Sequence, residues 1–307
     1  MEKVLLTGVT GFIGLHCCKQ LLDEGYAVKG TLRDKIRQQE VITAMKESNT
    51  SVENLEIIEL DLLKDEGWEE AGRDCDYLMH VASPISASDS VDEEVLIRPA
   101  VDGTLRALNA AKANKIKKVI LTSSVASIFY DDSDKINYDE DDWSDVDSKK
   151  ITPYAKSKTM AEKSAWEFIE NLGEDEKFPL TVFCPYMVLG PALSPDLGGT
   201  NVLVQMLTSG TLPGTPNIHL GIVDVRDVAK AHITAMTCPK TDNERIILCK
   251  KELWLVEIAQ IFRTAGFMRP PVKEMPNFIV RILALFIKDL SGIANYVGQE
   301  VYSNKEK

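Results

Sequence analysis

The chain has 307 residues, of which 44% are hydrophobic and 27% are charged, a balance that is ordinary for a soluble globular protein. Its formal net charge of -12 argues against nucleic acid or an anionic membrane as the main partner. The six cysteines and four histidines have no spacing typical of metal ligands, so we expect no metal site and reduced, buried thiols.

The sequence shows no segment that we expect to cross a membrane. Residues 1–7 begin a strand-like run at once, without the charged-then-apolar leader of an exported protein. The nearest candidate for a spanning helix, residues 278–287, is interrupted by Arg281 and falls short of the roughly 18 apolar residues required. We interpret it as an amphipathic docking helix and expect the protein to be cytoplasmic.

Strand and helix patterns alternate through the first half of the chain. Short apolar runs predict strands at residues 4–7, 27–32, 55–60, 77–81, 119–122 and 180–184. Helical patterns are found at residues 12–22, 36–47, 91–113 and 154–172. The alternation predicts right-handed crossovers and an α/β fold in which helices cover both faces of a parallel sheet. The acidic segment 131–147 has neither pattern and is interpreted as a solvated loop.

The rhythm changes after Pro185, where proline and glycine cluster at residues 191–199 and 210–216. We interpret these clusters as the crossing into a smaller lobe, with one return to the sheet near residues 222–227. Apolar residues of this lobe are candidates for the wall of a pocket, although burial in a core is their default: Leu193, Met206, Leu207, Leu212 and Ile218.

Three glycines lie between the first strand and the first helix, at positions 8, 11 and 14. A glycine-rich turn there lets the backbone approach a pyrophosphate, which the N–H groups and dipole of the helix N-terminus attract. The GxxGxxG spacing differs from the GxGxxG form of two-domain dehydrogenases, and an ordinary strand-to-helix turn is the alternative. We favour a dinucleotide site, to which these residues would contribute: Thr7, Gly8, Thr10, Gly11, Phe12, Ile13 and Gly14.

The end of the second strand bears on the choice between the two nicotinamide dinucleotides. An NAD site usually has an acid there that binds the ribose 2′-hydroxyl. This strand ends in Leu32 and Arg33, and a guanidinium suits a 2′-phosphate through paired hydrogen bonds, so NADP is favoured. Asp34 is a contrary signal, and Lys35 and Arg37 are either additional cations of the site or simply solvated.

More cofactor contacts are expected where later strands end, because parallel strands deliver their C-terminal ends to one edge and ligands bind there. Asp61 and Leu62 follow the third strand, where a carboxylate can accept a hydrogen bond from an adenine amino group. Small residues that let the backbone pass beside the cofactor are expected where the fourth strand ends: Val81, Ala82 and Ser83. Thr122, the last residue of the fifth strand, is a further expected cofactor contact.

Tyr154 and Lys158 lie four residues apart, just after Pro153, which is typical of a helix start. The simple interpretation is that they are neighbours on a solvated helical face. The alternative is that the Lys158 ammonium lowers the pKa of the Tyr154 phenol, which then exchanges a proton with a carbonyl or alcohol oxygen. Ser124, at the end of the fifth strand, would polarise that oxygen. Lys158 would also hold the nicotinamide ribose.

Together these stretches resemble the extended short-chain dehydrogenase/reductases. The resemblance rests on TGVTGFIG, DL at 61–62, HVASP, TSS and YAKSK, while TLRD, VDGTLRAL and CPYMVLGP resemble the dihydroflavonol reductase, cinnamoyl-CoA reductase and aldehyde reductase group. It implies a Rossmann-type doubly wound sheet, hydride transfer from NADPH to a carbonyl, and Ser124, Tyr154 and Lys158 as the catalytic set. It also implies that Pro185 and Val188 lie beside the nicotinamide.

The same resemblance suggests how the chain is divided and what it acts on. An NADP-binding domain is expected at 1–189 plus about 219–240, and a mostly helical substrate lobe at about 190–218 and 241–307. Phe129 stands where plant flavonoid reductases carry a polar side chain, so a small carbonyl or alcohol other than a flavonoid is expected beside Ser124, Phe129 and Tyr154. Relatives continue beyond Lys307, and a homodimer through the helices near Val91 and Tyr154 is one expectation.

Two other functions compete with an NADPH-dependent carbonyl reductase. A nucleotide-sugar epimerase or dehydratase would retain a tightly held NAD, and Arg33 without an acid at the strand end argues against it. A non-catalytic NADP-sensing module usually lacks the tyrosine, whereas Tyr154 and Lys158 are both present. A scaffold protein with the same fold is a further alternative, because fold does not imply function.

Overall fold

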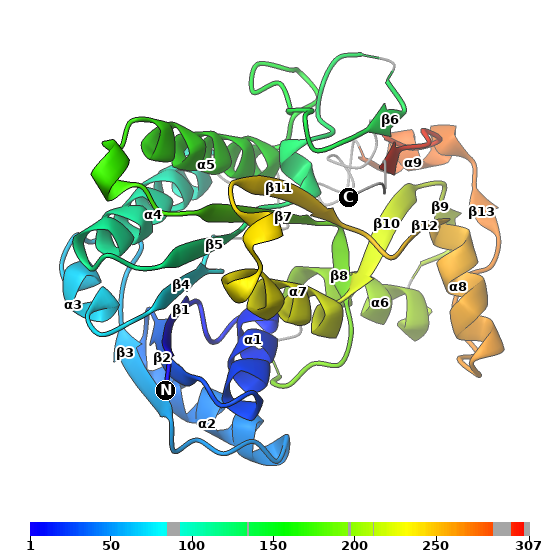
Figure 1. The fold of residues 1–307 in the computed structure, drawn as a ribbon. Helices are drawn as coiled ribbons and strands as arrows, with labels where there is room; N and C mark the ends of the chain where they lie inside the picture. The colour runs from blue at the N-terminus through cyan, green and yellow to red at the C-terminus, as the bar shows by residue number, and fades with distance from the viewer. Residues whose placement is uncertain (85–92, 134, 196–197, 211, 285–295, 304–307) are drawn as a thin grey trace.

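The computed structural model describes residues 1–84, 93–133, 135–195, 198–210, 212–284 and 296–303 (Figure 1). Within them, seven parallel strands form the central sheet in the order β11-β7-β5-β4-β1-β2-β3. These strands are β1 (Lys3–Thr7), β2 (Ala27–Leu32), β3 (Leu55–Glu59), β4 (Tyr77–His80), β5 (Lys118–Thr122), β7 (Leu180–Pro185) and β11 (Glu244–Leu248). The predicted parallel sheet is therefore confirmed, and the six strands predicted for it agree to within one residue.

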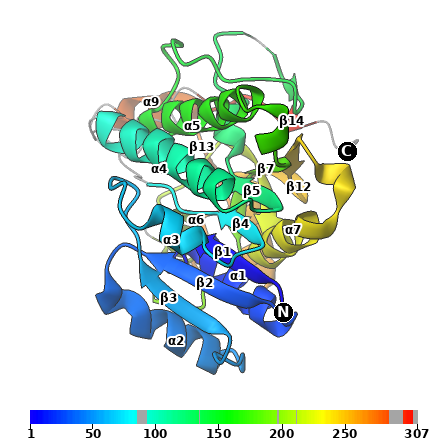
Figure 2. The same ribbon diagram turned by 60° about the vertical axis from the view of Figure 1, so that its left-hand side comes forward.

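Both faces of the sheet are apolar, and helices cover each of them (Figure 2). In β1, Val4 and Leu6 pack with α1 (Phe12–Asp23), α2 (Gln38–Glu47) and α7 (Val225–Thr237). The intervening Leu5 packs on the other face with α3 (Trp68–Gly72), α4 (Glu93–Ala113) and α5 (Pro153–Glu170). Successive side chains of a strand alternate between faces, so a continuous apolar strand requires cover on both. The helix predicted at residues 91–113 corresponds to α4, and its residues 91–92 lie outside the described residues.

The return strand was predicted at the wrong place. Residues 222–227 were expected in the central sheet, but β10 (His219–Asp224) pairs with β8 (Met187–Leu189) and β12 (Lys251–Trp254) in a separate sheet. The seventh central strand is β11, which pairs with β7 and lies in a region assigned above to the smaller lobe. The cause is that β7 ends at Pro185, where the chain leaves the central sheet and forms β8. Strand β10 then pairs with β8 and not with β7.

The smaller lobe combines helices with short strands, on the right of Figure 1. Its elements are α6 (Gly198–Ser209), β9 (Thr215–Pro216), α8 (Leu255–Thr264), β13 (Glu274–Met275) and α9 (Asn277–Ala284), besides β8, β10 and β12. Leu207, Leu212 and Ile218 belong to or pack against its core, Leu193 packs against the main core, and Met206 is 39% exposed. Residues 285–287 of the expected docking helix lie outside the described residues. No helix in the described ranges combines the length and apolar character that crossing a membrane requires.

The acidic segment 131–147 is more firmly attached than a solvated loop. Its strand β6 (Asn137–Tyr138) pairs with β14 (Tyr302–Ser303), and Tyr138 is buried. The backbone carbonyls of Glu140 and Asp142 accept hydrogen bonds from the Arg245 guanidinium, which also stacks on the Trp143 ring at 3.7 Å from its centroid. The remaining short helices are η1 (Lys35–Arg37), η2 (Val125–Ser127), η3 (Glu174–Glu176) and η4 (Pro239–Thr241).

Candidate active site

The turn between β1 and α1 has no room for a side chain at Gly8 or Gly14. Gly8 has φ +73°, and a Cβ added to it would lie 2.9 Å from the Ala82 Cα atom. A Cβ on Gly14 would lie 2.1 Å from the Gly8 carbonyl oxygen. Helix α1 begins at Phe12, and its N-cap residue, Gly11, provides no side-chain hydrogen bond. The first-turn N–H groups are thus left for an anion, so the turn fits a pyrophosphate.

Thr7 holds the ends of β1 and β4 together. Its Oγ1 accepts hydrogen bonds from the N–H groups of Val81 and Ala82, each at 3.1 Å, and lies 2.9 Å from Nδ1 of His80. A hydroxyl has one proton, so Thr7 donates to Nδ1 and His80 carries its proton on Nε2. Burial, helped by the nearby charge of Lys158, lowers the pKa of His80 to about 3, which keeps the ring neutral. The Thr7 hydroxyl is therefore engaged within the protein, and its direct cofactor contact stays a prediction.

The cations after β2 have different surroundings. Asp34, the acid that argued against NADP, is the N-cap of η1. Its carboxylate accepts a hydrogen bond from the Ile36 N–H at 3.0 Å. Arg37 forms a bidentate pair with Glu40 at 2.8 Å through both contacts. Arg33 is exposed at the tip of the strand. Arg33 and Lys35 are both exposed, so the contact of Arg33 with a 2′-phosphate stays a prediction.

The other predicted cofactor residues are distributed between the sheet edge and the core. The Asp61 carboxylate accepts the Leu63 N–H at 3.0 Å, whereas Leu62 packs against α4, where a Cβ on Gly103 would lie 2.7 Å from its side chain. Val188 is buried in a small apolar cluster against which Phe12 and Ile13 pack, which brings β8 to the glycine turn. Thr10 and Ser83 are half-buried, and Pro185 is buried at the end of β7.

Ser124, Tyr154 and Lys158 are brought together by the end of β5 and the start of α5. The N-cap Thr152 accepts the Ala155 N–H at 3.1 Å, and Pro153 occupies the first helical position. Tyr154 therefore lies in the first turn, with Lys158 one turn further along the same face. The Ser124 side chain lies close enough to the Tyr154 phenol to act on its pKa. The spacing of the tyrosine and lysine thus places both beside a strand end.

The expected lowering of the Tyr154 pKa does not hold in this structure. Removal of the phenol from water raises the pKa of Tyr154, and the neighbouring Ser124 hydroxyl opposes this rise. Lys158 instead donates to the backbone carbonyl of Thr122 at 3.2 Å. Burial lowers the pKa of Lys158 to about 8, while the charge of Glu162 opposes that shift. At neutral pH the phenol is therefore protonated and the amine charged.

Sequence patterns missed the buried polar residues behind this trio. Thr122 Oγ1 lies 2.8 Å from Nε2 of His232, whose Nδ1 donates to the Val228 carbonyl at 2.8 Å, so Thr122 donates to Nε2. Glu162 forms a buried ion pair with Arg245. The position of Glu162, four residues after Lys158, was a usable signal, but the partner on β11 had none.

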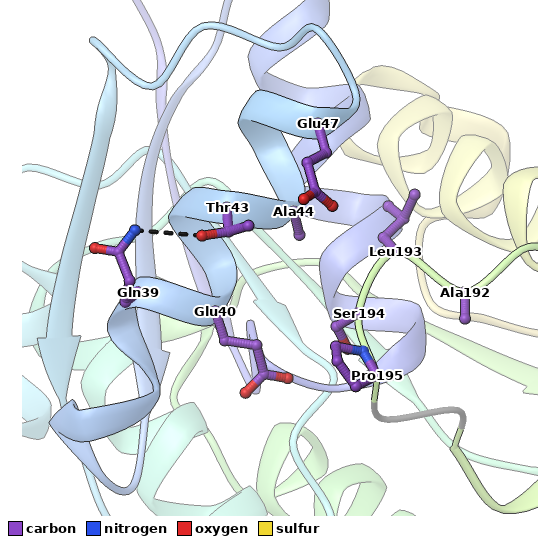
Figure 3. A pocket seen from close by; sticks show the side chains of 9 residues that line it. All are labelled: Gln39, Glu40, Thr43, Ala44, Glu47, Ala192, Leu193, Ser194 and Pro195. Atoms are coloured by element: carbon purple, nitrogen blue, oxygen red, sulfur yellow. Dashed lines mark hydrogen bonds between the residues drawn. The ribbon is translucent and has the colours of Figure 1, made fainter.

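The space around the trio differs from the larger hollow of the molecule. Lys158 lines a cavity of about 10 Å³ together with Thr122, Ser123 and Glu162, a volume close to the smallest that can hold one water molecule. A cavity of about 520 Å³ lies between α2 and the segment Ala192–Pro195, away from the trio (Figure 3). Phe129 is half-buried, with its ring centroid 5.2 Å from that of Tyr138 and also 5.2 Å from that of Tyr186.

The doubly wound parallel sheet and its glycine turn define a Rossmann-type dinucleotide-binding protein. The chain belongs to the NAD dependent epimerase/dehydratase family, whose model matches residues 4–249, and within it to the extended short-chain dehydrogenase/reductases. In the described residues, no group of three or more His, Cys, Asp or Glu side chains could hold a metal ion.

Named relatives and a solved structure resemble most of the chain. Tetraketide alpha-pyrone reductase 1 of Arabidopsis thaliana is 36% identical over 278 residues, which cover 89% of this chain and 83% of the relative. Cinnamoyl-CoA reductase 1 of the same plant is 34% identical over 265 residues, covering 85% and 74%. The structure of yeast methylglyoxal/isovaleraldehyde reductase Gre2 complexed with NADPH has a TM-score of 0.82 at 26% identity, covering 99% of this chain and 91% of that one.

Proposed function

We propose that the protein is an NADP(H)-dependent oxidoreductase that reduces an aldehyde or ketone to the alcohol, reversibly, with Tyr154 as the proton donor. The observation that carries the proposal is that Ser124, just after β5, lies beside the Tyr154 phenol in the first turn of α5, with Lys158 one turn further along the same helix. The reductases among the relatives support the same class of reaction.

The residues of the chain have separate tasks in this reaction. Bound NADPH would supply the hydride; the glycine turn would hold its pyrophosphate, Arg33 its 2′-phosphate and Lys158 its nicotinamide ribose. Ser124 donates a hydrogen bond to the substrate oxygen and so draws electron density towards it. Tyr154 donates its proton to that oxygen as negative charge develops there. The charged amine of Lys158 stabilises the resulting phenolate.

Two observations support NADPH rather than NADH as the cofactor. Yeast Gre2, which resembles nearly the whole chain, was solved with NADPH. Asp34, the acid next to the strand end, is occupied as the N-cap of η1, while Arg33 is exposed. A carboxylate beside the 2′-position would favour a hydroxyl, whereas a free guanidinium favours a phosphate.

Arg33→Ala should weaken NADPH binding by roughly 10- to 100-fold, the equivalent of a charge-assisted hydrogen-bonding contact, and leave NADH binding nearly unchanged. Dissociation constants for both cofactors can be measured from the quenching of tryptophan fluorescence. Lys35→Ala is the matched control, because Lys35 is also an exposed cation of this segment and should have a smaller effect. Equal losses for both cofactors in Arg33→Ala would contradict the role of Arg33.

A substrate panel tests the reaction itself. Phe129, the residue expected beside the substrate, is half-buried and packs against the rings of Tyr138 and Tyr186, which favours aromatic or aliphatic carbonyls over polyhydroxylated sugars. We expect loss of NADPH absorbance with aldehydes or ketones of this kind, and no interconversion of nucleotide sugars. Turnover of a nucleotide sugar without any reduction of these carbonyls would favour the epimerase or dehydratase alternative.

A further inference from the structure

A buried ion pair lies directly behind the strand end that carries Ser124. Glu162 on α5 is 1% exposed and Arg245 on β11 is 7% exposed. Arg245 Nε donates to one carboxylate oxygen, and Nη2 lies 3.4 Å from the other. The hydroxyls of Ser123 and Ser127 also donate to Glu162, the latter at 2.6 Å. Both carboxylate oxygens of Glu162 therefore accept hydrogen bonds from donors of the protein in place of water.

Glu162 and Tyr154 lie on opposite sides of Lys158 along one face of α5. Each is four residues from the lysine, and positions i and i+4 lie one above the other on a helix. Lys158 and Glu162 also line the same cavity of about 10 Å³. The buried amine therefore has a phenol one turn before it and a carboxylate one turn after it.

Among the residues that the structure describes, one strong negative charge lies near Lys158. Titratable groups reach this region from four elements: Tyr154 and Glu162 from α5, His80 from β4, Cys184 from β7 and, behind Glu162, Arg245 from β11. His80 is neutral, and burial raises the pKa of the Cys184 thiol, which keeps it protonated. Among these groups, Glu162 is the carboxylate, and its negative charge can offset the cost of burying the amine.

We propose that Glu162, held in place by Arg245, is a positioning residue that keeps Lys158 charged and oriented towards the site. The inference rests on the proposed function in one respect, since it is the charged lysine that would hold the ribose and stabilise the phenolate. Its charge argument stands on the geometry of Glu162 and Lys158 alone.

The sign of the expected effect follows from the two cations. Without the carboxylate, Lys158 and Arg245 remain as buried cations, and a guanidinium does not lose its proton in proteins. Lys158 is then the group that deprotonates, so its pKa falls below the value of about 8 that it has with Glu162 present. Any rate that requires the charged amine will decline at a lower pH.

The test is a titration of Lys158 by NMR in the cofactor-free protein, with its side-chain resonance assigned by its absence from Lys158→Met. Glu162→Gln should lower the titration midpoint by about one pH unit or more. The alkaline limb of kcat/KM for carbonyl reduction should move in the same direction. Glu162→Asp keeps the charge and should restore most of both values. Glu167→Gln, which changes an exposed carboxylate of the same helix, should leave both unchanged.

An unchanged Lys158 midpoint in folded Glu162→Gln overturns the proposal. If that variant does not fold, Glu162→Gln combined with Arg245→Gln removes both charges of the pair and is titrated in its place. A smaller lowering of the Lys158 midpoint is then expected, because the Arg245 cation that also disfavours a charged amine is removed with the carboxylate. A wild-type chain that reduced no carbonyl would instead contradict the proposed function, and the NMR titration would still decide the role of Glu162.

Discussion

Tyr154→Phe should lower the turnover number by roughly 100- to 10,000-fold, which is the usual contribution of a general acid. The substitution keeps the ring and removes only the hydroxyl, which lies beside Ser124. Because burial raises the pKa of this phenol, the wild-type group is protonated at neutral pH and ready to donate. Folding and cofactor affinity should be nearly unchanged.

Steady-state rates with NADPH and a reactive aldehyde, together with a binding titration of NADPH, measure this effect. The alcohol-oxidising direction should be lost to the same extent, since the same atom takes up the proton there. Tyr130→Phe is a matched control, because Tyr130 pairs with the Tyr296 ring and has no part in the trio. If the Tyr154→Phe protein bound NADPH and kept most of its rate, the role of Tyr154 as proton donor would be contradicted. Tyr154 and Lys158 would then be only neighbours on one face of a helix.

Lys158→Met should cost as much as Tyr154→Phe or more. The substitution removes the charge that would stabilise the phenolate, along with the hydrogen bond to the Thr122 carbonyl. It should also weaken NADPH binding, because the same amine is proposed to hold the ribose. The two residues act on one proton, so the double variant should be scarcely slower than Lys158→Met alone.

The comparison that matters for Lys158 is between turnover and affinity. Isothermal titration with NADPH should show weaker binding for Lys158→Met and not for Tyr154→Phe. Lys156→Met is the matched control. Lys156 is on the same helix as Lys158, but its amine pairs with Glu93 of α4 at 3.2 Å. Fully multiplicative losses in the double variant, or wild-type affinity in Lys158→Met, would contradict a shared role for the two side chains.

Local patterns were enough to predict most of the central sheet. Runs such as Leu180–Pro185 are apolar on both faces, and this pattern fits a strand covered by helices. The seventh strand was misplaced because the choice of partner strand is a tertiary property. Both 219–224 and 244–248 have strand character, and only the departure of the chain at Pro185 decides that β11, not β10, pairs with β7.

The parts of the site that depend on the spacing of residues close together in the sequence were predictable. The glycine turn and the Tyr154–Lys158 pair depend on short separations, and the structure brings the pair beside Ser124. The direction of the Tyr154 pKa was not predictable, because it depends on how far the folded chain excludes water. The Glu162–Arg245 pair spans 83 residues, and nothing in either local sequence indicates the other.

The position of Arg245 also has a consequence for the order in which the protein can form during synthesis. Chains emerge from the ribosome N-terminus first, so Ser123, Ser127 and Glu162 are available long before the guanidinium that joins them. A carboxylate buried without its cation is strongly destabilising. We therefore expect the first strands of the sheet to form early, whereas the edge between β5 and α5, which carries the proposed catalytic residues, is completed only when β11 pairs with β7.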